Sequence, residues 1–427
     1  MRELFIFLIV AFYTFNLSAQ NFNEAAAANG IAQSCGDCQF GGGVSFADFN
    51  GDGLDDLTFA TEVDQEILFY QNTGSGFQLI PPLVQVTGQT KQILWVDYDN
   101  DGDKDLFVAC FECPNRLFLN EGAGGFTDIT MDAGLPVEDS PTYSVVFGDV
   151  NNDGWLDLYV SSYTLDTDPG RLYRNNGNNT FTDITGASNI MDDNSLSLSV
   201  VFFDYNNDGL QDLHIANDKD YQENKLFENT GDGIFVDVSV AANVNITIDA
   251  MNGGIGDYDN NGYLDIYVTN EFPGNALLKN NGDGTFTDVA SSAGVEFNQI
   301  SWGGNFFDGD NDLDLDLYVS GSYTDAEFTS VLYVNENNGN NFLSQFLEGD
   351  TLSSFANAIG DFNLDGLLDI AVSNSDYFES TGDNFFHLWQ NTTSNANNWL
   401  KVFLVGTDSN REGIGSWIEM YINGQKY

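Results

Sequence analysis

The sequence predicts an all-β protein, a seven-bladed β-propeller with Ca-binding loops. Three observations support this prediction. A short acidic motif recurs seven times, and successive copies begin 49 to 55 residues apart. Each copy lies between short runs of alternating β-branched and aromatic residues, which are typical of strands bounded by turns. No stretch shows sustained helical periodicity, and four strands per repeat make one propeller blade.

The first residues have the features of an export signal. Arg2 precedes the apolar run at 4–15, and the small residues at 17–19 suit cleavage by a signal peptidase. We therefore expect residues 1–19 to be a signal peptide, and the mature chain to be secreted or held at the cell surface without a transmembrane segment. The alternative is an uncleaved membrane anchor, for which the run is short. Gln20 rather than Cys follows the expected cut, so no lipid attachment is indicated.

The segment that follows has no blade before it. Residues 21–31 resemble the outer-strand ends of later repeats, such as TFTDVASSAGV, while the seventh repeat has no matching outer strand after 385–390. An open propeller would leave two unpaired sheet edges. We therefore predict that a strand near Phe22 pairs with the last blade and closes the ring. The alternative is an unattached N-terminal tail.

The strands of each blade come from runs on both sides of the acidic motif. GGVSFA precedes the first motif and LTFAT follows it, and YSVVFG and LYVSSY flank the third. Most repeats contain a second hairpin, in which Asn and Gly supply the positive φ of a tight turn. These hairpins lie at 118–129, 173–184, 227–238 and 278–289. Two hairpins give four strands, and we assign residues 20–394 to the propeller.

The acidic motif itself has the pattern DxDxDGxxD, with Asn allowed at the third or fifth position. Carboxylates crowded into one turn repel each other unless a cation neutralises them. Hard Ca²⁺ takes six to eight oxygen ligands, and a tight turn directs alternate side chains to one centre. We therefore predict up to seven Ca²⁺ ions. Positions one, three, five and nine would supply side-chain oxygens, and position seven its backbone carbonyl.

The predicted ligands follow loop by loop. The side chains are Asp48, Asn50, Asp52 and Asp56; Asp97, Asp99, Asp101 and Asp105; Asp149, Asn151, Asp153 and Asp157; Asp204, Asn206, Asp208 and Asp212; Asp257, Asp259, Asn261 and Asp265; Asp308, Asp310, Asp312 and Asp316; and Asp361, Asn363, Asp365 and Asp369. The carbonyls are those of Leu54, Asp103, Trp155, Leu210, Tyr263, Asp314 and Leu367. Loop six is expected to be the weakest, because Leu313 replaces the turn glycine. Asn261 and Leu364 are also expected to lower affinity.

Position ten of every loop is Leu or Ile, which we expect to enter the next strand and anchor the loop in the core. An EF-hand, the nearest competing motif, would need Glu at position twelve and flanking helices. Position twelve here is an apolar strand residue, such as Phe59 in the first copy. The other alternative, solvated turn aspartates, does not explain seven copies in register.

The overall charge is strongly negative. The chain has 65 Asp plus Glu against 12 Lys plus Arg, a net charge of −53, yet 42% of its residues are hydrophobic and 14% are aromatic. This composition is sufficient for a core, so we expect a folded acidic protein rather than an acidic tail. The scarcity of Lys and Arg argues against nucleic acid as a partner, because these residues neutralise phosphates.

The four cysteines form two CxxC pairs, Cys35/Cys38 and Cys110/Cys113. In an exported chain we expect disulfides, either within each pair or between adjacent blades. A zinc site and a redox role are the alternatives. The predicted strand order places both pairs on the face opposite the calcium loops.

No catalytic motif is evident. His214 and His387 are the only histidines, and both lie in predicted strands, where we expect ordinary packing. The sequence has no nucleophile elbow, zincin or nucleotide-binding motif. We therefore expect no enzyme activity. The alternative is a calcium-dependent polysaccharide lyase or hydrolase that uses the face of the ring opposite the loops. Aspartate pairs could serve glycoside hydrolysis, although most clustered acidic residues are already assigned to calcium.

The seven loops resemble those of FG-GAP or VCBS repeats, the calcium-binding blades of integrin α-subunits and of many secreted bacterial proteins. This resemblance covers residues 22–391. Residues 399–415 match WLxVxLxGxxSNRxGIG, the signature that begins the ASPIC/UnbV domain. Together these parts are similar to the cartilage acidic protein family. The resemblance implies that the propeller is followed by the start of a small β-rich C-terminal domain, and we expect residues 395–427 to be its truncated beginning. The resemblance implies, by analogy, an adhesion or ligand-binding module for an extracellular protein or glycan.

Overall fold

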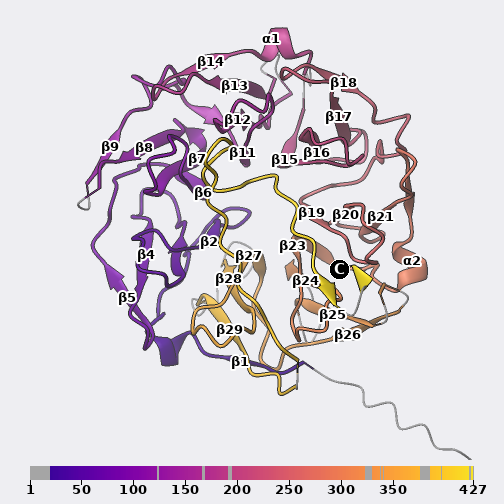
Figure 1. Ribbon diagram of the computed structural model, residues 1–427. Coiled ribbons are helices and arrows are strands. Elements are labelled where there is room, and N and C mark those ends of the chain that lie inside the picture. The colour runs from indigo at the N-terminus through magenta and orange to yellow at the C-terminus, as the bar shows by residue number, and fades with distance from the viewer. Residues whose placement is uncertain are drawn as a thin grey trace, which may run out of the picture.

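The computed structural model describes residues 20–122, 125–165, 169–190, 195–322, 329–336, 338–339, 341–375, 385–395, 397–422 and 425–426. In these residues, seven antiparallel sheets surround a common axis (Figure 1). The prediction of an all-β, seven-bladed propeller is therefore confirmed. Helical structure in the same residues is limited to three short elements, η1 (Ala27–Asn29), α1 (Thr185–Ser188) and α2 (Ala290–Ala293).

Blades 1 to 4 each run from an innermost strand outward. Blade 1 has β2 (Val44–Ala47), β3 (Asp56–Phe59), β4 (Leu68–Asn72) and β5 (Phe77–Ile80). Blade 2 has β6 (Gln89–Val96), β7 (Asp105–Cys113), β8 (Arg116–Asn120) and β9 (Phe126–Asp128), and β10 (Ser140–Pro141) also pairs with β7. Blade 3 has β11 (Val145–Gly148), β12 (Asp157–Val160), β13 (Arg171–Asn175) and β14 (Phe181–Asp183). Blade 4 has β15 (Ser197–Phe203), β16 (Asp212–Asn217), β17 (Lys225–Asn229) and β18 (Phe235–Asp237).

Blades 5 to 7 follow the same order. Blade 5 has β19 (Gly253–Gly256), β20 (Asp265–Val268), β21 (Ala276–Asn280) and β22 (Phe286–Asp288). Blade 6 has β23 (Ile300–Phe307), β24 (Asp316–Ser322), β25 (Val331–Glu336) and β26 (Asn341–Gln345). Blade 7 has β27 (Ser354–Gly360), β28 (Asp369–Asn374) and β29 (His387–Asn391), and its outer strand is β1 (Phe22–Glu24).

The acidic loops connect the two inner strands of every blade in one register. In blade 1, Ala47 at the end of β2 pairs with Asp56 at the start of β3. The residue before position one pairs with position nine in the other six blades as well. All seven loops therefore leave the sheets at the same end of the propeller. We number them loops 1 to 7 by blade and call this end the loop face.

The apolar core is divided among the contacts between neighbouring blades. Seven clusters of buried residues occur, and each combines side chains of two adjacent blades. Between blades 7 and 1, the rings of Phe59 and Phe386 stack with centroids 3.8 Å apart. The Leu or Ile at position ten is fully buried in every blade, which confirms its predicted role as an anchor.

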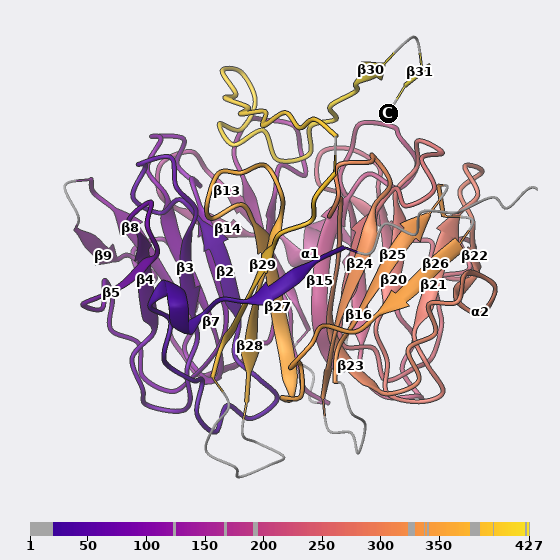
Figure 2. The ribbon, with the colours of Figure 1, turned by 90° about the horizontal axis from the view of Figure 1, so that it is seen from below.

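The N-terminal strand closes the ring. Strand β1 pairs antiparallel with β29, and Phe22 lies opposite Asn391 (Figure 2). The side-chain amide of Gln345 in blade 6 also donates a hydrogen bond to the carbonyl of Gln20, 2.6 Å long. The predicted pairing of the segment near Phe22 with the last blade is therefore confirmed. The expected signal peptide at 1–19 lies outside the described residues.

After blade 7, the chain crosses the loop face, and Figure 2 shows it above the ring of sheets. The indole of Trp399 packs directly on Gly366 in loop 7. Arg411 Nε lies 3.6 Å from Asp97 Oδ2 in loop 2. A two-stranded hairpin of β30 (Tyr421–Ile422) and β31 (Gln425–Lys426) follows. No helix among the described residues combines the length and the hydropathy needed to cross a bilayer.

Candidate metal centres

The turn of each acidic loop depends on two residues with left-handed backbone conformation. Position four has φ between 54° and 74° in all seven loops, and position six has φ between 77° and 100°. Such angles favour Gly and Asn, which explains their frequency at these positions. In loop 6, Leu313 adopts φ 77° at position six, so the turn is kept without its glycine. The weaker metal affinity expected for this loop stays a prediction.

Backbone amides orient the acidic side chains. In loop 1, the amide of Gly53 donates to Asp48 Oδ2 at 2.7 Å, and the amide of Leu54 donates to Asp52 Oδ1 at 3.0 Å. The bond from position six to position one occurs in all seven loops, with lengths of 2.7 to 3.0 Å. The bond from position seven to position five also occurs in all seven. The loops are therefore seven copies of one geometry.

Position nine carries a deeply buried carboxylate. These seven aspartates are at most 2% exposed, and each accepts two backbone N–H bonds, as Asp56 does from Phe49 and Asn72. Burial raises the pKa of Asp56 and Asp157 to about 7 and that of the other five to about 8. Within the described residues, none of the seven forms an ion pair with Lys, Arg or His. Burying a charge without a counter-charge is costly, so these carboxylates favour a bound cation.

Three loops bring three carboxylates together, with one oxygen of each within 4.8 Å of the others. The groups are Asp97, Asp99 and Asp101; Asp257, Asp259 and Asp265; and Asp308, Asp310 and Asp312. In the remaining four loops position three is Asn, so an amide oxygen would replace one carboxylate there. In the described structure, Asp97 Oδ1 and Asp259 Oδ1 are buried without a hydrogen-bond donor. An all-oxygen donor set with free buried carboxylate oxygens fits Ca²⁺.

The loops differ in the groups that lie beside them. In loop 5, the ammonium of Lys279 contacts Asp259 Oδ2, and this hydrogen bond raises the pKa of Lys279. In loop 6, the amide of Gln20 donates to Asp316 Oδ2 at 2.5 Å. In loop 2, the nearby cation is Arg411, from the segment after blade 7. Equivalent loops are therefore expected to differ in metal affinity.

One asparagine at the end of each third strand was missed by the sequence analysis, which treated it as a turn residue. Its backbone N–H donates to the position-nine carboxylate. Its side-chain amide donates to the backbone carbonyl of position eight. In six blades the side chain also donates to the carbonyl of position two in the preceding loop, as Asn229 does to Val150 at 2.7 Å. The only signal was its recurrence once per repeat. The blade-linking asparagines, which make this contact with the preceding loop, are Asn72, Asn175, Asn229, Asn280, Asn335 and Asn391. Asn120 is the corresponding residue of blade 2 and bonds within its own blade.

A second set of asparagines, at position four, connects consecutive loops directly. The side-chain amide of Asn100 donates to the carbonyl of Gly154 at 2.9 Å, from loop 2 to loop 3. Asn152, Asn207, Asn260 and Asn311 make the same contact with the next loop. Position four is Gly51 in loop 1 and Leu364 in loop 7, which have no such amide. The segment after blade 7 lies against loops 7, 1 and 2 at this interruption, and it also contacts loops 3 and 6.

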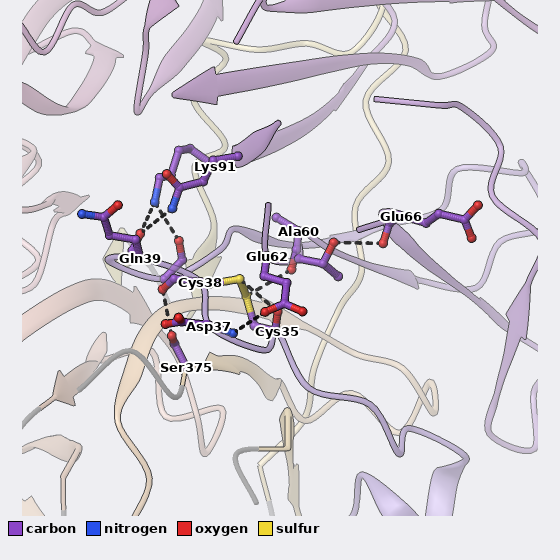
Figure 3. The surroundings of a disulfide bond; sticks show 12 residues. Cys35, Asp37, Cys38, Gln39, Ala60, Glu62, Glu66, Lys91 and Ser375 are labelled. Carbon is purple, nitrogen blue, oxygen red and sulfur yellow. Dashed lines mark hydrogen bonds between the residues drawn. A yellow bond between two sulfur atoms is a disulfide. The ribbon is translucent and has the colours of Figure 1, made fainter. Parts of the chain in front are cut away.

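The cysteines form local disulfides, Cys35–Cys38 and Cys110–Cys113. Cys35 and Cys38 precede β2, and Cys110 and Cys113 end β7, so both disulfides lie away from the loop face. Figure 3 shows the first disulfide and its surroundings. Of the two connectivities that the sequence left open, the structure has the local one.

Both histidines are packed within strands, as the sequence predicts. His214 is fully buried and His387 is 7% exposed. Burial lowers the pKa of each to about 4. Neither ring nitrogen of His214 has a hydrogen-bond partner in the described part of the chain. Neither side chain is therefore placed to act on a substrate in solvent.

The chain matches known proteins over its repeats. A family model described as FG-GAP-like repeat matches residues 48–108, 97–160, 163–215, 204–268 and 257–319, together more than half of the chain. Cartilage acidic protein 1 of Xenopus tropicalis is 29% identical over 230 residues, which are 47% of this chain and 35% of that protein. Human cartilage acidic protein 1 is 27% identical over 167 residues, 36% of this chain and 25% of that protein. The matches thus span about a third or less of these relatives.

Solved structures share the fold at low identity. BBS1N in complex with ARL6DN has a TM-score of 0.54 and 11% identity, and the match covers 89% of this chain and 99% of that one. YCF48 bound to D1 peptide has a TM-score of 0.50 and 9% identity, with coverage of 84% and 93%. These likenesses support the propeller fold alone. The family follows from the repeats: this chain belongs to the proteins built from FG-GAP-like repeats and is a propeller similar to cartilage acidic protein 1.

Proposed function

We propose that this protein is an exported, calcium-stabilised propeller that binds an extracellular protein or glycan. The observation that carries the metal proposal is the set of seven position-nine aspartates, which are buried and have no cationic partner among the described residues. Calcium would neutralise them together with the outer carboxylates of each loop. Seven ions would change the formal net charge from −53 to about −39.

The proposed ligand-binding role follows from the family rather than from the metal loops. FG-GAP-like repeats and the similarity to cartilage acidic protein 1 favour a binding module. The two histidines are buried and are not placed to serve as the base that the alternative, a polysaccharide lyase, needs beside its uronate. Incubation with acidic and neutral polysaccharides, monitored by absorbance of unsaturated products and by reducing ends, tests that alternative.

Chelation is the direct test of the metal proposal. Each independent site occupied at about 100 times its dissociation constant stabilises the folded chain by about 2.7 kcal/mol. We therefore expect excess EDTA to lower the melting temperature strongly, and added CaCl₂ to restore it. MgCl₂ at the same concentration should restore less, because Mg²⁺ demands a smaller octahedral shell.

A pair of variants makes this test specific to the loops. Asp52→Asn removes one outer ligand charge of loop 1, and Asp132→Asn removes an exposed carboxylate outside the loops. The first variant should bind one calcium fewer, or one more weakly, by calorimetric titration, while the second should titrate like the wild-type chain. Identical melting curves with EDTA and with calcium would refute the metal proposal.

A further inference from the structure

A cavity of about 350 Å³ lies on the propeller axis, and all seven blades contribute to its wall. Its lining residues come from the innermost strands and the segments before them, such as Val44, Gln92 and Phe355, and exclude the last two residues of each of these strands. Because these strands end at the acidic loops, the cavity belongs to the half of the molecule opposite the loop face. Its volume suits one small ring compound.

The charge of this cavity differs from that of the rest of the molecule. The chain has 65 acidic residues, yet the described wall of the cavity contains neither Asp nor Glu. Its only charged side chain is Lys91 of β6, in a chain with only 12 basic residues. The remaining polar groups are amides and hydroxyls. The cavity is therefore suited to a neutral or anionic ligand and not to a cation.

Lys91 is only 6% exposed. Its ammonium donates hydrogen bonds to the carbonyls of Gln39 and Gly41, as Figure 3 shows for Gln39, and lies 4.9 Å from the centre of the Tyr143 ring. All these partners are uncharged, and no carboxylate among the described residues lies within ion-pair distance. Burial lowers the pKa of Lys91 to about 7. An anionic group in the cavity would supply the missing counter-charge.

Aromatic rings form the adjoining wall. Trp302 packs against Phe40 and Phe355, with ring centroids 5.8 Å and 5.0 Å away. The indole N–H of Trp302 donates to Ser322 Oγ at 2.7 Å, which fixes the orientation of the ring. Phe40 lies between the two residues whose carbonyls accept bonds from Lys91. Lys91, Phe40 and Trp302 therefore line the same cavity.

Amide side chains complete the wall with fixed positions. Asn252 donates to the carbonyl of Gly304 at 2.8 Å, and Asn305 donates to the side-chain oxygen of Asn357 at 2.7 Å. These bonds join neighbouring blades, so the amides are held without a ligand. An ammonium, an aromatic face and oriented amides together match a ring that carries hydroxyls and one carboxylate.

We propose that the axial cavity binds a hexuronate, with its carboxylate at Lys91 and its ring against Trp302. This assignment builds on the proposed ligand-binding function and specifies the chemistry of the ligand. It uses none of the predicted metal ligands. Charge separation within the molecule is consistent with it, because the acidic loops that would repel a uronate lie at the other end of the propeller.

The test compares D-glucuronate with D-glucose, which differ in having a carboxylate or a hydroxymethyl group at the same carbon. Calorimetric titration is carried out on the full chain in excess calcium. A charge-assisted hydrogen bond contributes about 1.5 to 3 kcal/mol, so glucuronate should bind about tenfold or more tightly than glucose. Equal affinity for the two sugars, or no saturable binding of glucuronate, would overturn the proposal.

Three variants locate the interaction. Lys91→Met should reduce the preference for glucuronate to about twofold or less, while Lys225→Met, which removes a lysine from the outer half of blade 4, should leave the preference unchanged. Trp302→Leu should weaken both sugars by a similar factor and so keep the preference. An unaltered preference in Lys91→Met contradicts the assignment. If Lys91→Met does not fold, the hexuronate proposal is tested by the wild-type comparison of the two sugars and by Trp302→Leu.

The metal proposal is monitored separately in the same samples by melting with EDTA and with calcium. A chain that calcium stabilises but that fails to distinguish the sugars refutes the hexuronate site alone. A chain that prefers glucuronate but melts identically with EDTA and with calcium refutes the metal proposal alone. The two failures are therefore distinguishable.

Discussion

At the scale of single residues, the blade-linking asparagines show how a small polar side chain joins two blades. The side-chain amide of Asn229 donates to Val150 in blade 3 and to Gln211 in its own blade, at 2.7 and 3.1 Å. Its backbone N–H holds the buried carboxylate of Asp212 at 2.8 Å. One residue thus connects a predicted metal ligand, its own loop and the neighbouring blade.

We expect Asn229→Ala to lower the free energy of unfolding by about 2 to 3 kcal/mol, because two buried carbonyls lose their donor. Asn281→Ala is the matched control, since its exposed amide bonds only the hydroxyls of Thr285 and Thr287. The control should change stability by about 0.5 kcal/mol or less. Urea denaturation in excess calcium measures both, and equal losses would contradict a special role for Asn229.

His214 provides a prediction about pH. Its pKa is lowered by burial to about 4, from an ordinary value of 6.5. Between these values the unfolded chain binds a proton that the folded chain does not, so acidification lowers the free energy of unfolding. The expected contribution is about 1.4 kcal/mol per pH unit.

His214→Leu removes this contribution. As pH falls from 6.5 towards 4, the stability of the variant relative to the wild-type chain should rise, while at pH above about 7.5 the difference should be constant. Denaturation over a pH series with calcium present measures the difference. Parallel pH profiles throughout would show that the imidazole is not buried in its neutral form.

At the scale of elements, the three-residue strand β1 has an effect larger than its length suggests, because without it blade 7 has only three strands. Phe22 is 9% exposed, and its ring lies 6.4 Å from that of Phe307 in blade 6. The strand therefore joins blade 7 to the segment that precedes blade 1, and it covers the contact between blades 6 and 7.

Phe22→Ala should lower the free energy of unfolding by about 3 kcal/mol, the usual cost of truncating a buried phenylalanine. Leu79→Ala is a suitable control, because Leu79 also lies in an outermost strand but is 42% exposed. Its loss should cost about 0.5 kcal/mol or less. A similar small effect of both substitutions would mean that β1 contributes little to closure.

The elements were well predicted by the sequence because each signal is local. Alternating apolar residues fix the strands, and the regular spacing of the motif fixes the number of blades. The contacts across blades had no such signal. Asn229 has the sequence context of an ordinary turn residue, and only the radial arrangement brings its amide to Val150, 79 residues away in the chain. The position of Arg411 over loop 2 was unpredictable for the same reason.

At the scale of the whole molecule, the net charge of −53 makes self-repulsion a large term. We expect the chelated chain to gain melting temperature as NaCl is raised, because salt screens like charges over about 10 Å at 0.1 M. The calcium-loaded chain should respond less, since the proposed ions would already neutralise the loops. A scanning calorimetry series in both states measures this. An equal response to salt in both states would contradict the proposed neutralisation.

The pairing of β1 with β29 also dictates when folding can finish. Strand β1, which precedes blade 1 in the chain, completes the sheet of blade 7, because Phe22 lies opposite Asn391. A nascent chain that has emerged through blade 6 still has no partner for its first strand. Synthesis must therefore pass Asn391 before the circle can close, and any helper protein that shields the waiting sheet edges would act in the interval before that point.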